Sequence, residues 1–546
     1  MTTYEPNLNS ARRSGAASRA LKHTCAVMAL YAAGAMALPA QFTTLYSFPG
    51  DAGTEAGAGP TAGMIQGANG NLYGATYGQE YALEPNFIYE MTPGGVVTTL
   101  YTFCSTCQEG GGVPGALVQI QPNGDLYGTT TSGGSNGAGT VFMITPGGAL
   151  TTLYNFCSES GCTDGGTPLN GLVQATNGYL YGTTSTGGAN GNGTIFKITP
   201  AGALTTLYSF CAVSGCTDGN TVLGNLIQAT NGNLYGTTLD GGLNSGGTIF
   251  KITPAGVFTT LYRFCAASST CPDGQGPIGL MQATNGNFYG VTQGGGTGGG
   301  TAPCTLFFGI PCGTVFEFTT GGTLTTIYNF CSLPNCSDGA QPYTQLIQAT
   351  DGYLYGTNTA AGPLTGAGGG SPRRGSARYG ASGGPGSDGG ITPMYPGTIF
   401  KISTSGVLTM LDNFCVYPDS SCGAVPVAPL VQATNGTLYG TTTQGGSGEC
   451  YTLDWNGCGV VFSLAVGLGP FVETRPTIGE AGKVVKILGT DLTGTTSVKF
   501  NGTAAAFSVV KPTLISTTVP AGATSGTVEV VTPSGTLRSN VRFVVP

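Results

Sequence analysis

A short Leu-Tyr-Gly or Phe-Tyr-Gly motif recurs along the chain and constrains its fold more than any other feature. Its tyrosines are Tyr73, Tyr127, Tyr181, Tyr235, Tyr289, Tyr355 and Tyr439. The first four intervals are 54 residues each, and the last two are 66 and 84 residues. A recurring period of this length indicates a repeat architecture in which each unit is one supersecondary element.

Each unit contains four short stretches with the composition of β-strands. In the unit that starts at residue 225, these stretches are "NLIQAT", "NLYGTT", "GTIFKIT" and "VFTTLYRF". The first two are joined by Asn-Gly, which favours a two-residue type I′ hairpin turn because both central residues need a positive φ. Four antiparallel strands per unit predict the blades of a β-propeller.

The phase of the repeat predicts how the ring closes. A lone strand of the fourth type, residues 42–48, precedes the first unit, and residues 459–466 end the last unit with a strand of the third type. One strand, six complete sets and three further strands would fill seven blades. We therefore predict an all-β chain with a seven-bladed β-propeller over residues 41–467, closed by the N-terminal strand so that no edge is exposed. An open solenoid of seven units is the alternative, but it gives no reason for this permutation.

The first 40 residues differ from the rest, with four basic residues before a short apolar run that ends in small residues. This pattern predicts a secretory signal peptide over residues 1–40. A membrane anchor is the alternative, but it needs about 20 apolar residues, and the run is shorter. We expect a secreted or cell-surface protein without a transmembrane segment after cleavage.

Cleavage would change the charge and the available chemistry. Of the 18 basic and 25 acidic residues, four basic residues and one acidic residue would be lost, which leaves 14 and 24 and a net charge of −10. Such a charge disfavours nucleic acid as a partner. The single histidine, His23, would also be lost. The mature chain could then run neither a Ser-His-Asp nor a Cys-His mechanism.

Sixteen of the 17 cysteines fall into eight close pairs. The pairs are Cys104/Cys107, Cys157/Cys162, Cys211/Cys216, Cys265/Cys271, Cys304/Cys312, Cys331/Cys336, Cys415/Cys422 and Cys450/Cys458. An even set in a secreted chain predicts disulfides, and pairing within each couple is the simplest arrangement. Zinc is the alternative, but only the first pair has the CxxC spacing of a zinc site. We expect no metal and no cofactor.

The loops after the fourth strands hold the candidate binding residues. Four of these loops place an aspartate before a glycine at matching positions, and a later loop contains the only tryptophan. The candidate ligand-binding residues are Asp164, Asp218, Asp273, Asp338 and Trp455. The alternative for the aspartates is an Asp-Gly turn formed for its own geometry. Calcium would need about six to eight oxygens, which no local run of acidic residues supplies. We expect ligands on this loop face and only stability from the Asn-Gly turn face.

The motif "LYGTT…GG…GTIFKITP", for example at residues 180–200, resembles the GloVer tandem repeat of secreted bacterial proteins of the choice-of-anchor type. The resemblance covers residues 42–466. It implies a secreted or surface role and brings no known catalytic residues. The cysteine pairs and a Gly-rich insertion at 362–397, which contains Arg373, Arg374 and Arg378, depart from the pattern.

The remaining segment, residues 468–546, consists of short alternating strands between Gly, Pro and Asn turns, which predicts a small β-sandwich. It resembles an IPT/TIG domain, an immunoglobulin-like module, at Gly482, Gly489 to Leu492, Phe500 to Gly502, Pro520 and Thr532 to Gly535.

Together these features favour a noncatalytic binding or adhesion protein whose partner is an extracellular glycan or another surface protein. The first alternative is an extracellular carbohydrate-active enzyme, a lyase or hydrolase, that uses carboxylates of the loop face. Acidic residues near that face include Asp240, Glu449 and Asp454. The second alternative is a structural envelope protein.

Overall fold

A computed structural model describes residues 40–49, 59–76, 86–103, 111–120, 123–297, 305–306, 310–360, 397–414, 423–447 and 458–546. They lie in one compact unit, Pro39–Pro546. The described residues form β-strands and short 3₁₀ turns, and no α-helix occurs among them.

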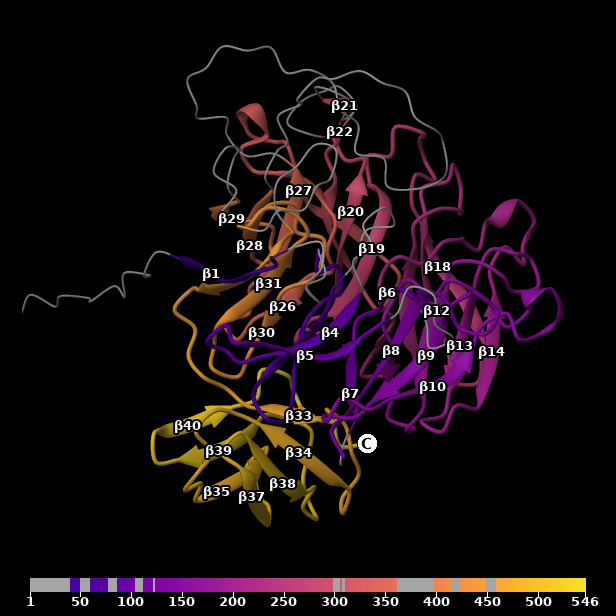
Figure 1. Cartoon of the computed structure of the whole chain (residues 1–546). Coiled ribbons are helices and arrows are strands. Elements are labelled where there is room, and N and C mark those ends of the chain that lie inside the picture. Colours follow the sequence, from indigo (N-terminus) through magenta and orange to yellow (C-terminus); the bar gives the residue numbers. More distant parts are fainter. Residues whose placement is uncertain are drawn as a thin grey trace, which may run out of the picture. The chain divides into compact units, whose positions relative to one another are not determined.

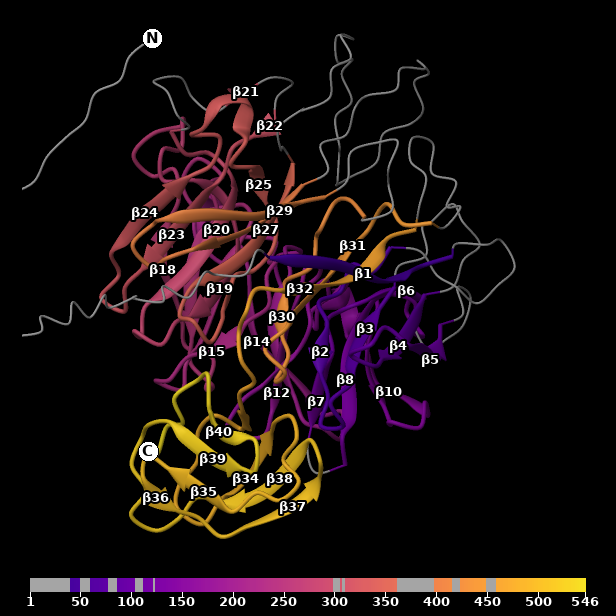
Figure 2. The same cartoon turned by 90° about the vertical axis from the view of Figure 1, so that its left-hand side faces the viewer.

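Seven of the sheets among the described residues are the predicted blades, labelled in Figures 1 and 2. Blade 1 contains β2 (Ile65–Gln66), β3 (Leu72–Ala75), β4 (Phe87–Met91) and β5 (Val97–Thr102). Blade 2 contains β6 (Gly111–Pro114), β7 (Val118–Ile120), β8 (Asp125–Ser132), β9 (Thr140–Ile144) and β10 (Leu150–Asn155). Blade 3 contains β11 (Val173–Gln174), β12 (Leu180–Thr184), β13 (Thr194–Ile198) and β14 (Leu204–Ser209). Blade 4 contains β15 (Ile227–Gln228), β16 (Leu234–Thr238), β17 (Thr248–Ile252) and β18 (Phe258–Arg263).

The other blades follow the same order. Blade 5 contains β19 (Gln275–Gln282), β20 (Phe288–Gly294), β23 (Thr314–Phe318) and β24 (Leu324–Asn329). Blade 6 contains β25 (Ala340–Pro342), β26 (Ile347–Gln348), β27 (Leu354–Ala360), β28 (Thr398–Ile402) and β29 (Leu408–Asn413). Blade 7 contains β30 (Val431–Gln432), β31 (Leu438–Thr442), β32 (Val460–Ala465) and β1 (Gln41–Ser47). A small hairpin, β21 (Thr305–Leu306) and β22 (Ile310–Pro311), stands apart.

The N-terminal strand closes the ring as predicted. Strand β1 pairs antiparallel with β32, from Gln41 opposite Ala465 to Ser47 opposite Val460. The fold is therefore an all-β, seven-bladed propeller. Because β1 covers β32, the last blade is a complete four-stranded sheet in the order β1-β32-β31-β30.

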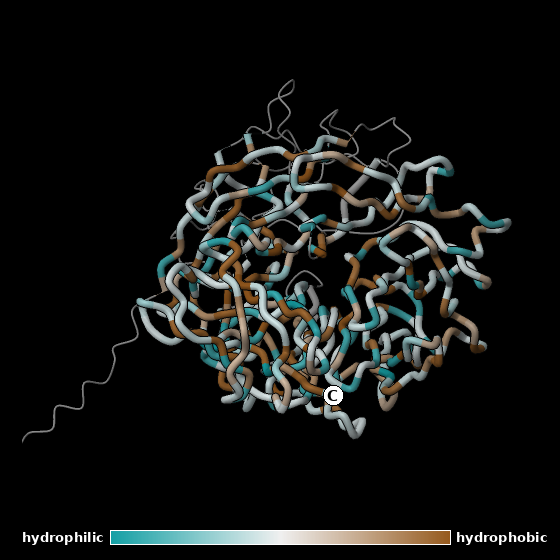
Figure 3. Tube along the Cα trace, turned by 90° about the horizontal axis from the view of Figure 1, so that it is seen from below, coloured by the Kyte–Doolittle hydropathy of each residue, from teal (hydrophilic) through white to brown (hydrophobic). Residues whose placement is uncertain are grey.

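Aromatic side chains join each blade to the next. The phenylalanine after the fourth strand is buried, and Phe156 packs edge to face on Phe196 of the next blade, with ring centroids 5.2 Å apart. At the closure Phe48 makes the equivalent contact with Tyr89 at 5.7 Å. Such pairs contribute about 0.5–1.5 kcal/mol beyond their buried area. Figure 3 shows the hydrophobic segments recurring around the propeller.

The glycine of the Leu-Tyr-Gly motif is required by packing within the blade. A Cβ on Gly182 would lie 2.5 Å from the ring of Phe196 and 2.8 Å from Leu172. The phenylalanine of "GTIF" therefore lies directly over this glycine, which explains why the two motifs recur together.

The Asn-Gly hairpins differ from the predicted type I′ turn. In blade 3 the positive φ falls on Gly178 (85°) and not on Asn177. Gly178 N donates to Ala175 O at 2.9 Å, which closes a type I turn followed by a left-handed glycine. The asparagine has another task, because Asn177 Nδ2 donates to the hydroxyl of Tyr181 at 2.8 Å. This bond explains the fixed spacing between the turn and the tyrosine.

A belt of glutamines links the first strands of the blades. Thr230 N donates to Gln282 Oε1 of the next blade at 2.9 Å, while Gln282 Nε2 donates to Gly286 O at 2.9 Å. The described residues show six such steps between neighbouring blades, and the step from Thr434 to Gln66 crosses the closure. The belt therefore ties the blades together at the turn face.

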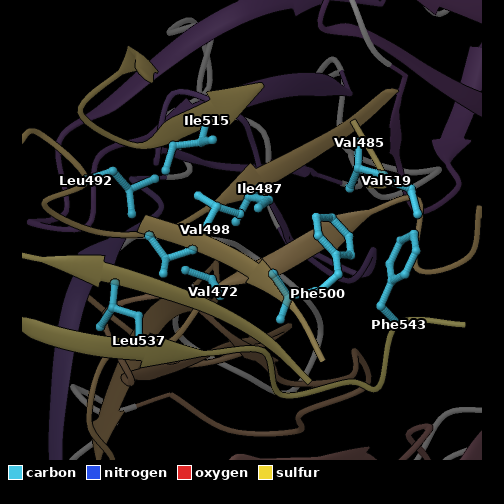
Figure 4. Close-up of a cluster of buried hydrophobic side chains, with 12 residues drawn as sticks. Val472, Val485, Ile487, Leu492, Val498, Phe500, Ile515, Val519, Leu537 and Phe543 are labelled. Carbon is cyan, nitrogen blue, oxygen red and sulfur yellow. The ribbon is translucent and has the colours of Figure 1, made fainter. Parts of the chain in front are cut away.

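The C-terminal segment folds as the predicted sandwich. One sheet contains β33 (Glu473–Arg475), β34 (Val484–Leu488), β38 (Leu514–Thr518) and β37 (Phe507–Lys511). The other contains β36 (Thr503–Ala504), β35 (Ser497–Phe500), β39 (Val528–Thr532) and β40 (Gly535–Arg538). Buried side chains from both sheets, including Ile487 and Val498, form the core shown in Figure 4. The sandwich contacts the turn face of the propeller, where Thr513 Oγ1 donates to Ala68 O at 2.9 Å.

Candidate functional site

The loop face is built on short, disulfide-bonded loops that follow the fourth strands. The predicted local pairs are confirmed for Cys157–Cys162, Cys211–Cys216, Cys265–Cys271 and Cys331–Cys336. Cys312 and Cys458 are also disulfide-bonded. The cysteines Cys104, Cys107, Cys304, Cys415, Cys422 and Cys450 lie outside the described residues. In three loops a 3₁₀ turn ends at the second cysteine: η1 (Ser160–Cys162), η2 (Ser214–Cys216) and η4 (Pro334–Cys336).

Each of the four predicted aspartates is bound by its own loop. The Asp164 carboxylate accepts hydrogen bonds from the hydroxyl of Tyr154 at 2.8 Å and from the Ser158 backbone N–H at 2.9 Å. Asp218, Asp273 and Asp338 accept the same bond from Tyr208, Tyr262 and Tyr328 at 2.6, 2.9 and 2.9 Å. Asp164, Asp218 and Asp338 are at most 2% exposed. The four carboxylates therefore brace the loops.

The ionisation of this network follows from its burial and its hydrogen bonds. Burial opposes the ionised form of Asp164, but the bonds from Ser158 and Tyr154 outweigh it and lower the pKa of the carboxyl. Burial, together with the neighbouring carboxylate, raises the pKa of Tyr154 to about 12. The tyrosine therefore stays a hydrogen-bond donor and the aspartate an acceptor throughout the neutral range. A ligand-binding role for the four aspartates and for Trp455 stays a prediction. Trp455 and residues 362–396 of the insertion lie outside the described residues.

Asp240 is a carboxylate of a different kind. It follows β16 at the end of the second strand of blade 4, and its backbone pairs with Asn220, just before the innermost strand. The corresponding positions in other blades hold Ser132, Thr186, Gly294, Ala360 and Gln444. The side chain of Asp240 is exposed, and no described residue gives its carboxylate a hydrogen bond or an ion pair. Although the side chain reaches solvent, the surrounding protein partly desolvates the carboxyl and raises its pKa above the ordinary value.

Among the described residues, Asp412 is the other loop-face carboxylate with a raised pKa, which also results from burial. It replaces the tyrosine of the fourth strand in blade 6, and its carboxylate accepts a hydrogen bond from Asn413 N at 2.8 Å. Because β29 is the last strand of its sheet, Asp412 lies at the outer edge of the blade. Of these two described carboxylates, Asp240 is therefore the one nearer the centre of the loop face.

The described residues contain no cluster of three or more His, Cys, Asp or Glu side chains that could hold a metal ion. In the same part of the chain, no helix is both long and apolar enough to cross a membrane.

These features define the class of the protein, a closed propeller of tandem repeats with an immunoglobulin-like module. Residues 35–222 match the family model of the Gloeobacter/Verrucomicrobia repeat, and residues 473–545 match that of the IPT/TIG domain. The two matches confirm the resemblances that the sequence showed, to the repeat family in the first blades and to an IPT/TIG domain at the C-terminal end. A search of curated proteins found no match.

Several solved structures resemble the chain. A puromycin hydrolase is 10% identical, and the match covers 82% of this chain and 61% of the hydrolase chain, with a TM-score of 0.41. A gluconolactonase from Xanthomonas campestris is 11% identical and covers 76% and 98%, with a TM-score of 0.34. The PQQ-bound aldose sugar dehydrogenase from Streptomyces coelicolor is 14% identical and covers 64% and 94%, also with a TM-score of 0.34.

These findings correct the expectation of a noncatalytic binding protein that is not an enzyme, because the similar structures are mostly those of enzymes. The likeness concerns the fold and assigns neither a substrate nor a catalytic residue to this chain.

Proposed function

We propose that the protein is an extracellular carbohydrate-active enzyme, a hydrolase or lyase, in which Asp240 is the general acid. The observation that carries this proposal is the exposed, unpartnered carboxyl of Asp240 near the centre of the loop face, with its raised pKa. A raised pKa keeps the carboxyl protonated at a pH where an ordinary aspartate is ionised. This is the state in which it can donate a proton to a leaving group.

The chemistry requires two groups. Asp240 would protonate the glycosidic oxygen as its bond to carbon breaks, while a base activates water in a hydrolase or removes a proton from the sugar in a lyase. The sequence offers Glu449 and Asp454 as this base, and both lie outside the described residues.

Two unpaired polar atoms on the loop face support a sugar substrate. Asn220, which pairs with Asp240 through the backbone, has a buried Oδ1 without a hydrogen-bond partner among the described residues. In blade 7, Gln444 occupies the position that matches Asp240, and its buried Oε1 also lacks a described partner. Buried polar atoms are usually satisfied, so unpaired ones at a functional face need an explanation. A bound sugar can supply the hydroxyl donors that these oxygens lack after a small side-chain movement.

An extracellular location is supported by the signal-like N-terminus and by the disulfides, which persist in oxidising compartments. In this proposal the four loop aspartates hold the loops in place, and Trp455 is a stacking residue for sugar rings.

The test is a screen of the mature protein on neutral and acidic polysaccharides, read by new reducing ends and by the ultraviolet absorbance of unsaturated products. Asp240→Asn should lower kcat/KM by about 100-fold or more on any substrate found. Thr186→Ala, at the matching position of blade 3, is the control and should retain activity. No cleavage by the wild type, or full activity of Asp240→Asn, would contradict the proposal.

A further inference from the structure

A second candidate site lies at the turn face, at the opposite end of the blades from Asp240. A cavity of about 1320 Å³ is bounded by the turn ends of the first strands and by the sandwich. The sandwich contributes Glu473, Arg475, Lys486 and Arg542 to its wall. Small-molecule pockets measure about 300–1,000 Å³, so this cavity can hold a chain of several sugar rings.

The charges in the wall are unbalanced. The Glu473 carboxylate is occupied by Arg475, which donates to it through two nitrogens at 2.9 and 3.2 Å. Lys486 and Arg542 donate only to neutral oxygens, those of Ser516 Oγ and Ser525 O. Neither cation has an ion-pair partner among the described residues, so the wall carries two uncompensated positive charges in a chain whose net charge is −7. Such a wall attracts anions.

On the propeller side of the cavity lies one glutamine that takes no part in the hydrogen-bonded glutamine belt. Gln174 lines the cavity and is exposed, and no described residue forms a hydrogen bond with its amide. The sequence gives a reason for the missing bond. In blade 3 the residue before Asn-Gly is Thr176, whose N–H donates to Gln228 of the next blade, whereas in blade 2 the residue at this position is Pro122. Proline has no N–H to donate to the glutamine of the next blade. The amide of Gln174 is thus available to a ligand.

We propose that this cavity binds an acidic oligosaccharide, with Lys486 and Arg542 contacting its anionic groups and Gln174 its hydroxyls. The size of the cavity fits an oligomer, the two uncompensated cations recognise carboxylate or sulfate groups, and the amide provides both a donor and an acceptor. The site is separate from Asp240 and does not depend on catalysis there.

The test is calorimetric titration of the full chain carrying Asp240→Asn, so that no ligand is cleaved. The probes are an oligogalacturonide, a sulfated oligosaccharide, a neutral cello-oligosaccharide of equal length and inorganic sulfate alone. We expect either or both acidic oligosaccharides to bind at least 10-fold more tightly than the neutral one. Lys486→Met with Arg542→Gln should weaken this binding at least 10-fold, and Gln174→Ala should weaken it severalfold.

Arg538→Gln is the matched control, because Arg538 lies in the same domain, pairs with Glu529 and does not line the cavity. It should bind as the parent does. Equal binding of the neutral probe, equal affinity for sulfate alone, no binding of either acidic oligosaccharide, or unchanged binding by the Lys486/Arg542 variant would each overturn the proposal. A failed polysaccharide screen with successful titrations would reject only the catalytic role of Asp240.

Discussion

The two faces of the propeller use the same construction principle with different chemistry. On the loop face an aspartate that accepts a hydrogen bond from a tyrosine holds each of four loops, and Asp240 is a carboxylate without such a partner among the described residues. On the turn face a glutamine links neighbouring blades in six steps, and Gln174, at the step between blades 2 and 3, has no hydrogen-bond partner among the described residues. In both cases the fold satisfies the repeated residue, and a group becomes available to a ligand where the repeat is interrupted, by Asp240 itself on the loop face and by Pro122 beside Gln174 on the turn face. The comparison suggests that function should be sought where a repeat is interrupted.

The scaffold that both faces share should show the largest effect. Deleting residues 41–48 removes β1 and its pairing with β32, and it also removes buried Phe48. We expect aggregation or the loss of cooperative unfolding for two reasons. Strand β32 becomes an exposed edge, and the loss of a buried phenylalanine side chain lowers the free energy of unfolding by about 3–5 kcal/mol. Circular dichroism and light scattering during heating would measure it. A truncated protein that melts like the full chain would contradict the closure.

Acid should affect the loop face in a defined direction. The pKa of Asp164 is lowered in the folded state, so its stabilising effect is fully present above the unfolded value of about 3.9 and is lost as the pH falls through the folded pKa. Unfolding by urea, measured from pH 6 to pH 2, should show a smaller acid dependence for Asp164→Asn than for the wild type. Identical pH profiles would show that the bonds from Ser158 and Tyr154 do not hold the ionised form.

The glutamine belt should give the smallest effect. Gln228 accepts a bond from Thr176 N at 2.9 Å and donates to Gly232 O at 2.9 Å, so Gln228→Ala should lower the free energy of unfolding by about 1–2 kcal/mol. Gln174→Ala removes no such bond and should leave stability within about 0.5 kcal/mol of the wild type. Equal losses in urea titrations would contradict the distinction between the two glutamines.

Much of the fold follows from local patterns in the sequence. The strand count around Phe42 to Phe48 was enough to predict the closure with residues 459–466, because a repeat read in phase fixes the order of its strands. The type I′ turn was wrong because Asn-Gly fits either turn type, and the bond from Asn177 to Tyr181 is made only in the folded blade. The noncatalytic function was also a wrong prediction, since the motifs carried no information on chemistry.

The candidate sites depended on contacts that no local pattern contains. The aspartates of the loops were correctly singled out as recurring, yet their tyrosine partners lie about 10 residues earlier in the chain and become visible only in the fold. The cavity at the turn face was not predicted, because its wall joins residues as distant as Gln174 and Arg542. Asp240 and Pro122 were visible in the sequence as departures from the repeat, which is the signal that could have identified both sites.

The most direct test of this account compares two aspartates of the same blade, Asp218 and Asp240. Asp218→Asn places an amide NH₂ against donors from Tyr208 and Ala212, so the free energy of unfolding should fall by about 2 kcal/mol, while the folded variant should retain kcat/KM on the substrate that the proposed activity identifies. Asp240→Asn should lower kcat/KM without lowering the free energy of unfolding. Its raised pKa means that ionisation disfavours the folded state above pH 3.8, so the variant should be at least as stable as the wild type at pH 7 while its activity is lost. Loss of activity in both variants, or a destabilised but active Asp240→Asn, would contradict the account.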